Sequence, residues 1–210
     1  MATPIDLDAF AATLRDFCAK WGILADEEAV SRCKRHLELL QRWNRVMNLV
    51  GDLSLQTAVE RHYGEGLYLA TFLPEGVGNV ADIGSGGGFP GAPVAAMRRE
   101  ASMVLIESRT KKATFLREST RDWGNVAVFC GLAADYKGSV DWICSRGVAG
   151  DYLFGPAQEH GASLLLLAGS GDVARLEESC RGIGQETESW ELPWRPQASV
   201  VLSTPPKRDA

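Results

Sequence analysis

The residues with the clearest capacity for chemistry form a glycine-rich run, DIGSGGGFPG, at positions 82–91. The run follows a short apolar stretch at 77–80 and precedes small residues with a helical pattern at 92–97. This order predicts a strand, a tight turn and the start of a helix. Glycine lets the backbone of such a turn approach a nucleotide closely, because it tolerates dihedral angles and contacts that a Cβ atom forbids.

Two classes of nucleotide cofactor use this architecture. A dinucleotide fingerprint G-x-G-x-x-G read from Gly84 fails, because Phe89 takes the place of the third glycine. Read from Gly86 it fits, but Pro90 then stands where the helix should open. The carboxylate of Asp82 would repel a pyrophosphate, whereas it suits the sulfonium and ammonium groups of S-adenosylmethionine. The pattern acidic-x-Gly-x-Gly-x-Gly is typical of class I methyltransferases, and a plain glycine-rich surface loop is the remaining alternative.

Further candidate ligand residues lie where the next strands are expected to end. Glu107 ends the second strand and could accept hydrogen bonds from ribose hydroxyls. Ala133 and Ala134 follow the third strand, where small residues would permit backbone contact with an adenine ring. Arg146 follows the fourth strand and could clamp a carboxylate or a phosphate. The structural alternatives are a surface glutamate, a helix-opening turn and a surface ion pair, respectively.

Cations follow Glu107 directly, at Arg109, Lys111 and Lys112. Near a cofactor crevice they predict a polyanionic substrate, and the alternative is a solvated helix face. The fourth strand carries neither the Asp/Asn-Pro-Pro-aromatic motif of amino-group methylases nor the Pro-Cys nucleophile of cytosine methylases. Cys144 is therefore predicted to be a buried core thiol. No catalytic residue is assigned, and the isolated His36 and His62 are expected to be neither ligands nor bases.

The bulk composition is that of an ordinary globular protein. The chain has 210 residues, of which 45% are hydrophobic and 23% charged, and its net charge is −5. It has five cysteines but no C-x-x-C spacing, no signal peptide, and no apolar run long enough to span a membrane. We therefore expect a cytoplasmic monomer with reduced cysteines, without a metal site or a membrane contact.

The periodicity predicts two parts: a helical N-terminal region over residues 1–75, and a nucleotide-binding core over 76–210. Helices are expected at 7–21, from Asp26 as N-cap to about 43, at 55–72, 91–98, 110–121, 150–159 and 172–182. Strands are expected at 79–83, 103–107, 126–130, 140–144 and 163–168, followed by an antiparallel hairpin within 187–203. The continuous apolar strands suit a mostly parallel sheet covered on both faces, so the fold class is α/β and Rossmann-like.

Several segments together resemble the GidB family, also called RsmG. They are the glycine run, the segment ESRTKKATFLRE at 107–118, Ser145-Arg146, WNRVMNL at 43–49 and ERH at 60–62. The resemblance implies a class I methyltransferase fold with a helical N-terminal extension. It implies S-adenosylmethionine as cofactor, and N7 of a guanosine in small-subunit (16S) ribosomal RNA, free or in an assembly intermediate, as acceptor.

The resemblance also implies roles for particular residues. The family's cofactor contacts fall on Gly84, Phe89, the Ala133–Ala134 pair and Arg146, to which the residue pattern adds Asp82, Gly86 and Glu107. Arg109, Lys111, Lys112 and Arg146 are the expected substrate contacts. Because guanine N7 already has a free lone pair, transfer to it requires no general base, which agrees with the lack of an evident catalytic residue.

The chain departs from the family pattern on the substrate-facing side. After His62 the family usually has an Asp-Ser pair, where this chain reads YGEGL at 63–67. The family often has a glutamate at the position of Ala134, an alanine at Gly147, and a lysine where Ala168 ends the fifth strand. A divergent member, a paralogue acting on a small molecule, and a non-catalytic RNA-binding relative are therefore the alternatives.

Overall fold

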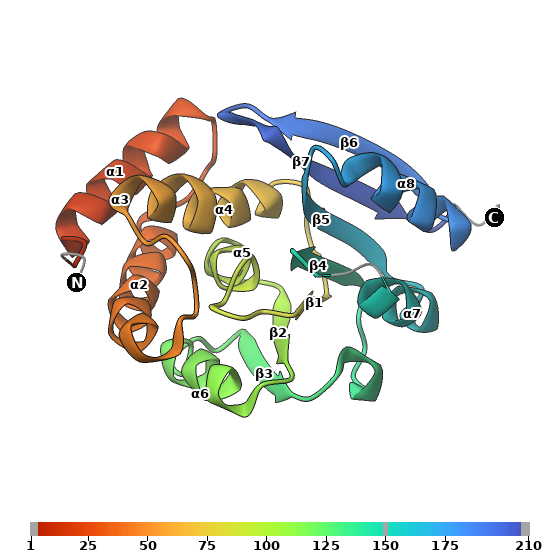
Figure 1. Cartoon of the computed structure of the whole chain (residues 1–210), viewed down its shortest axis with the longest axis horizontal. Coiled ribbons are helices and arrows are strands. Elements are labelled where there is room, and N and C mark those ends of the chain that lie inside the picture. The colour runs from red at the N-terminus through yellow and green to blue at the C-terminus, as the bar shows by residue number, and fades with distance from the viewer. Residues whose placement is uncertain (1–3, 149–150, 207–210) are drawn as a thin grey trace.

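A single seven-stranded sheet organises the computed structural model, which describes residues 4–148 and 151–206. The strand order is β3-β2-β1-β4-β5-β7-β6 (Figure 1). The strands are β1 (Asn79–Ile83), β2 (Ser102–Glu107), β3 (Val126–Cys130), β4 (Trp142–Arg146), β5 (Ser163–Gly169), β6 (Glu186–Leu192) and β7 (Arg195–Thr204). The first five strands run parallel, and β7 pairs antiparallel with both β5 and β6. The predicted parallel sheet with a terminal hairpin is confirmed.

Helices cover both faces of this sheet. They are α1 (Leu7–Lys20), α2 (Glu27–Met47), α3 (Leu55–Thr57), the π-helix η1 (Ala58–Gly64), α4 (Glu65–Ala70), α5 (Gly91–Met97), α6 (Thr110–Ser119), the 3-10 turn η2 (Ala133–Asp135), α7 (Asp151–His160) and α8 (Val173–Gly182). Alternate residues of each strand point to opposite faces, so Val80 and Leu105 join one core and Ala81 and Ile106 the other. Because both faces are buried, the strands read as continuous apolar runs.

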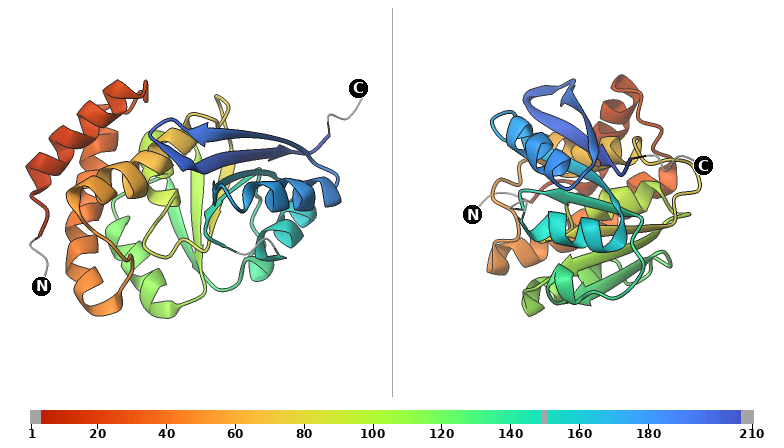
Figure 2. Two further views of the ribbon diagram at one scale, coloured as in Figure 1. Left: turned by 45° about the horizontal axis from the view of Figure 1, so that its top comes forward. Right: turned by 90° about the vertical axis from the view of Figure 1, so that its right-hand side faces the viewer.

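The two faces are covered by different parts of the chain. The larger core packs α1, α2, α4, α5 and α6 against one face, and α7 and α8 pack on the other (Figures 1 and 2). The N-terminal helices therefore share a core with the sheet. The proposed division of the chain at residues 75 and 76 stays a prediction.

Local sequence explains where the N-terminal helices begin. The side chains of Asp6 and Asp26 accept hydrogen bonds from the backbone N–H groups of Ala9 and Ala29, which caps α1 and α2. The predicted N-cap at Asp26 is confirmed. The single helix expected at 55–72 is instead α3, a π-helical turn and α4 in succession.

One strand begins later than its sequence indicated. The fourth strand was expected at 140–144, but β4 begins at Trp142, which pairs with Val80. The reason is that Asp141 precedes the ladder and its carboxylate accepts a hydrogen bond from the N–H of Asn79 at 2.7 Å. The shift makes Arg146 the last residue of β4 at the carboxyl end of the parallel sheet. Of the helices that the structure describes, none has the length and apolar character needed to cross a membrane.

Candidate active site

The glycine turn joins β1 to α5 and needs glycine for its backbone conformation. The φ angles of Gly84, Gly86 and Gly88 are 76°, 56° and 89°, in the left-handed region that side chains disfavour. The N–H groups of Gly84 and Ser85 donate to the carbonyl oxygen of Ile106 at 2.9 and 3.1 Å. These bonds fix the turn against the end of β2, at the edge where open α/β sheets bind ligands.

Asp82 supports the turn from beneath and is fully buried. Its Oδ2 atom accepts a hydrogen bond from the N–H of Gly91 at 3.1 Å, at the first residue of α5. A Cβ atom on Gly91 would lie 2.5 Å from that same oxygen, so glycine is required there. The Oδ1 atom is buried without a hydrogen-bond partner among the described residues. Burial raises the pKa of Asp82 to about 7, because water no longer solvates the carboxylate.

Glu107 holds the turn from the side. Its Oε2 atom accepts a hydrogen bond from the N–H of Gly86 at 3.0 Å, and its Oε1 atom accepts one from the N–H of Arg109 at 2.8 Å. The residue is 7% exposed, and each carboxylate oxygen retains a lone pair for a further donor. The carboxylate is thus oriented before any ligand arrives.

A cavity of about 630 Å³ opens beside this turn, at the carboxyl ends of β1, β2 and β3. Four of the eight predicted cofactor residues line it: Gly84, Glu107, Ala133 and Ala134. Its other walls include Ile83, Ile106, Leu132, Val148, Tyr152 and Pro156. A mostly apolar cavity of this size, with two carboxylates, Glu107 and Glu159, in its lining, has the chemistry of a nucleoside site.

The other four predicted cofactor residues lie outside the walls of this cavity. Asp82 and Gly86 shape the turn, as described above. Phe89 is 4% exposed and packs beneath the turn, with the ring of His62 stacked on it at 5.0 Å. The guanidinium carbon of Arg146 lies 5.4 Å from the centre of the Phe89 ring.

Arg146 belongs to a buried charge cluster that the sequence did not reveal. Its Nη1 atom donates to the carbonyl oxygen of Arg61 at 2.5 Å and to Oε2 of Glu65 at 3.0 Å. The other oxygen of Glu65 accepts a hydrogen bond from Arg195. The Glu65 side chain is only 1% exposed, so one buried carboxylate holds two guanidinium groups. We call Glu65, Arg146 and Arg195 the Glu65 cluster.

His62 completes the surroundings of Arg146. Burial lowers the pKa of His62 to about 4, so its ring is neutral at pH 7. Its Nε2 atom lies 2.9 Å from the carbonyl oxygen of Asp52, and must carry the proton because a carbonyl only accepts. The Nδ1 lone pair then faces Nη2 of Arg146 at 3.5 Å. His62 therefore orients its neighbours, in a role that its isolation in the sequence gave no reason to expect.

The three predicted substrate cations stand apart from the cavity. Arg109, Lys111 and Lys112 line a separate hollow of about 400 Å³ together with Val46 and Met47. Lys112 still lies near the turn, since its Nζ atom is 3.9 Å from where a Cβ of Gly86 would be. The structure thus brings these three together, and it places the fourth predicted substrate residue, Arg146, in the Glu65 cluster.

One smaller prediction from the sequence, the burial of a cysteine, can be checked. Cys144 is fully buried, as predicted, and burial raises the pKa of its thiol well above the ordinary value. Within the described residues, no group of three or more His, Cys, Asp or Glu side chains is placed to hold a metal ion.

Comparison with known sequences identifies relatives of this chain. A sequence model of the GidB family, described as "rRNA small subunit methyltransferase G", matches residues 29–153. The protein named ribosomal RNA small subunit methyltransferase G from Stenotrophomonas maltophilia is 33% identical over 201 residues, which cover 93% of this chain and 89% of that one. Its namesake from Rhodospirillum centenum is 39% identical, over 70% of this chain and 67% of the relative. For the namesake from Halorhodospira halophila, 39% identical, the match spans 46% of the relative's length.

Solved structures share the fold at low sequence identity. An S-adenosylmethionine-dependent O-methyltransferase from Thermotoga maritima superposes with a TM-score of 0.58 at 15% identity, covering 81% of this chain and 73% of that one. An S-adenosylmethionine-dependent methyltransferase from Aquifex aeolicus gives 0.58 at 14% identity, covering 70% and 92%. These likenesses establish the Rossmann-like methyltransferase fold. Together with the family match, they show that this chain belongs to the rRNA small subunit methyltransferase G family of S-adenosylmethionine-dependent enzymes.

Proposed function

We propose that this protein transfers a methyl group from S-adenosylmethionine to N7 of a guanosine in small-subunit ribosomal RNA. The observation that carries the proposal is the preformed cavity at the carboxyl ends of β1–β3, with Gly84 and Glu107 in its wall, in a chain of this family. Ribosomal RNA as substrate implies action in the cytoplasm. The expected monomer stays a prediction.

The residues at the cavity fit the chemistry of the cofactor. Glu107 has free lone pairs for the ribose hydroxyls, and Ala133 and Ala134 leave room for a flat ring. Asp82 lies beneath the turn with an unpartnered Oδ1 atom, and in its ionised form its charge favours a cationic ligand over a pyrophosphate. The bound cofactor would supply an electrophilic methyl group on a sulfonium.

Catalysis in this proposal depends on the positioning of the substrates and on the electrostatic field of the site. Guanine N7 has a lone pair and loses no proton on methylation, so the site needs no base. Arg146 ends β4, the neighbour of β1, and its guanidinium carbon lies 5.4 Å from the centre of the Phe89 ring in the glycine turn. Because Glu65 and Arg61 already engage Nη1 of Arg146, we assign that residue a positioning role beside the glycine turn. We assign Arg109, Lys111 and Lys112 to the RNA.

Calorimetry with S-adenosylhomocysteine tests the cofactor half of the proposal. A valine at Gly84 would place its Cβ 2.5 Å from Val148, at a φ of +76°, so Gly84→Val should abolish binding. Ala134→Phe should abolish it too, by filling the cavity without changing the turn. Gly124→Ala is the control, because a Cβ there meets no atom within 4 Å. Binding by both cavity variants as by the wild type would refute this placement of the cofactor.

Nucleoside mass spectrometry tests the acceptor. Small-subunit RNA that lacks the modification is incubated with the protein and S-adenosylmethionine, then digested. One new 7-methylguanosine is the expected product, and it should be lost with Ala134→Phe. Cofactor binding without methylation of free RNA or of assembled small subunits would refute the acceptor and favour a small-molecule methyltransferase.

A further inference from the structure

The lysines and arginines of this protein fall into two groups, those that form an ion pair with a carboxylate and those that do not. Within residues 4–148 and 151–206, thirteen lysines and arginines form ion pairs. The cations without such a pair are Lys20, Arg45, Arg61, Arg109, Lys111, Lys112 and Arg117. In a protein with net charge −5, carboxylates are plentiful, so a gathering of unpaired cations on one part of the surface is notable.

Four of these cations belong to the last turn of α2 (Arg45) and to the start of α6 (Arg109, Lys111 and Lys112), two segments that lie close together (Figure 1). The two helices are held together by packing of Trp43 against Phe115, with ring centres 5.8 Å apart. Arg109, Lys111 and Lys112 share a hollow with Val46 and Met47 from the last turn of α2. The Val46 side chain is 87% exposed.

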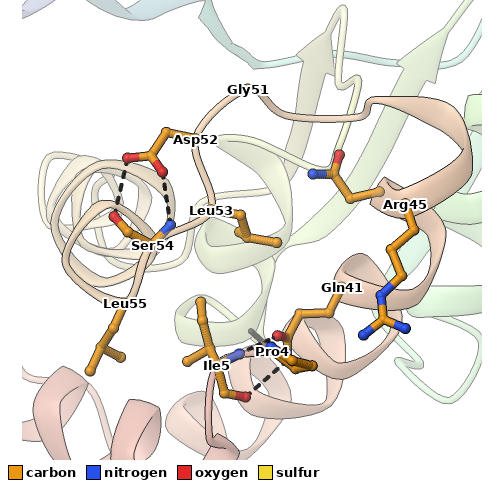
Figure 3. Close-up of a pocket in the computed structure, with 10 residues that line it drawn as sticks. Pro4, Ile5, Gln41, Arg45, Gly51, Asp52, Leu53, Ser54 and Leu55 are labelled. Atoms are coloured by element: carbon orange, nitrogen blue, oxygen red, sulfur yellow. Dashed lines mark hydrogen bonds between the residues drawn. The ribbon is translucent and has the colours of Figure 1, made fainter. Parts of the chain in front are cut away.

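Arg45 lies in the wall of a second and larger hollow, of about 700 Å³ (Figure 3). The side chains of Gln41, Asn44, Asp52 and Ser54 there each make at least one hydrogen bond. The Gln41 amide exchanges two hydrogen bonds with the backbone of Ile5, and the Asp52 carboxylate accepts from the backbone N–H and hydroxyl of Ser54. The Arg45 guanidinium has no hydrogen-bond partner among the described residues and points away from Asp52 (Figure 3). The last turn of α2 is therefore a ridge with a hollow on each side.

This ridge is continuous with the glycine turn. The segment after α2 packs on the turn, because a Cβ on Gly87 would lie 3.1 Å from Val50 and 3.5 Å from the carbonyl oxygen of Leu49. On the other side, Lys112 reaches toward Gly86. A polyanion lying across the ridge would therefore pass beside the cofactor cavity without entering it.

We propose that the α2–α6 ridge, formed by Arg45, Val46, Met47, Arg109, Lys111 and Lys112, docks the phosphate backbone of the RNA substrate. The inference rests on the proposed function and adds to it a role for the end of α2. Phosphates suit this surface because none of its four cations is paired with a carboxylate in the part of the chain that the structure describes, and counterions released from RNA supply binding free energy. The exposed Val46 side chain lies among them, where it can contact a sugar or a base.

The experiment measures the dissociation constant of a fluorescently labelled small-subunit RNA fragment between 50 and 200 mM salt. The test variants are Arg45→Gln, the double variant Lys111→Gln with Lys112→Gln, and the combination with Arg109→Gln. Each lost phosphate contact should lower the slope of log K against log salt by about 0.7–0.9, and the combination should weaken binding at least about tenfold. Arg42→Gln on α2 and Arg175→Gln on α8, both paired cations, are the matched controls and should bind as the wild type.

Equal salt slopes for Arg45→Gln and Arg42→Gln would overturn the proposal for the α2 side of the ridge. Unchanged affinity for naked RNA, with weakened affinity for assembled subunits, would overturn it in favour of an acidic protein partner. Calorimetry with S-adenosylhomocysteine separates this test from the proposed function, since ridge variants should bind that ligand as the wild type does. If the wild-type protein binds RNA through the ridge but forms no 7-methylguanosine, the proposed function is refuted. The proposal that the ridge binds RNA is then still supported.

Discussion

The Glu65 cluster and the α2–α6 ridge use arginine in opposite ways. In the cluster, one buried carboxylate binds Arg146 and Arg195, and the carbonyl oxygen of Arg61 takes a further donor from Arg146. On the ridge, Arg45 and Arg109 have no carboxylate partner among the described residues. Burial explains the difference. A charge removed from water must be paired, whereas water itself stabilises the charge of an exposed guanidinium.

This contrast separates structural from ligand-binding charge. An exposed cation contributes little to stability, whether it is paired or not. Leaving it unpaired therefore costs almost nothing, and its hydrogen-bond donors stay available to a ligand. The Glu65 cluster instead connects α4, β4 and the start of β7, so it fixes the end of β4 to the terminal hairpin. Substitutions in the Glu65 cluster should therefore lower the free energy of unfolding strongly, whereas substitutions on the ridge should hardly change it.

The largest effect is expected from Glu65→Ala. It leaves two guanidinium groups without their carboxylate at a position that is 1% exposed, which should cost about 3 kcal/mol of unfolding free energy. Glu28 is a matched control, since its exposed carboxylate also contacts two arginines, Arg32 and Arg35. Glu28→Ala should cost less than about 1 kcal/mol because solvent screens those pairs. Urea denaturation measures both, and equal costs would contradict the contrast between buried and exposed pairing.

A smaller effect, dependent on pH, is expected at Asp82, a buried carboxylate with no cation bound to it. Its pKa of about 7 in the folded protein lies above the ordinary value of 3.8. The folded state therefore holds a proton that the unfolded state releases, and the stability this gives is lost as pH rises toward and through 7. Asp82→Asn does not titrate, so its stability relative to the wild type should rise by roughly 2–3 kcal/mol from pH 5 to pH 8.

Denaturation of both proteins across that range provides the measurement. The buried His36 and His62, whose pKa values are lowered by burial to about 3 and about 4, change stability in the opposite direction. They are present in both proteins and cancel in the difference. Parallel stability curves for Asp82→Asn and the wild type would show that Asp82 is ionised throughout, as an interior carboxylate with a counterion would be.

Features fixed by local sequence were predictable. The glycine run predicted the turn because three of its residues require left-handed backbone angles, and continuous apolar segments predicted the parallel strands. Asp26 predicted the start of α2 because a capping carboxylate accepts a hydrogen bond from a backbone N–H only three residues away. The cavity wall at Gly84, Glu107, Ala133 and Ala134 followed from the rule that ligands bind at the carboxyl ends of such strands.

Features that depend on distant segments were not predictable in the same way. Glu65 and Arg195 are separated by 130 residues, and no local pattern indicates that they meet. The only signal was the segment 63–67, where the chain departs from its family and where Glu65 supplies a carboxylate three residues after His62. Arg45 likewise has no local pattern that separates it from Arg42 on the same helix. What separates the two is that Arg45 has no ion-pair partner among the described residues, which depends on the positions of carboxylates throughout the fold.

The smallest effect, and the most direct test of the ridge, compares two arginines three residues apart on α2. Arg42 pairs with Glu38 one turn away, whereas Arg45 has no ion pair within residues 4–148 and 151–206. Arg42→Gln should cost about 0.3–0.5 kcal/mol, and Arg45→Gln should change stability by less than that, in urea denaturation at low salt. A cost above about 1 kcal/mol for Arg45→Gln would mean that its guanidinium is held by the fold. In that case the ridge would be a structural element like the Glu65 cluster. A negligible cost, together with weaker RNA binding, would leave ligand binding as the reason why a cation stands there.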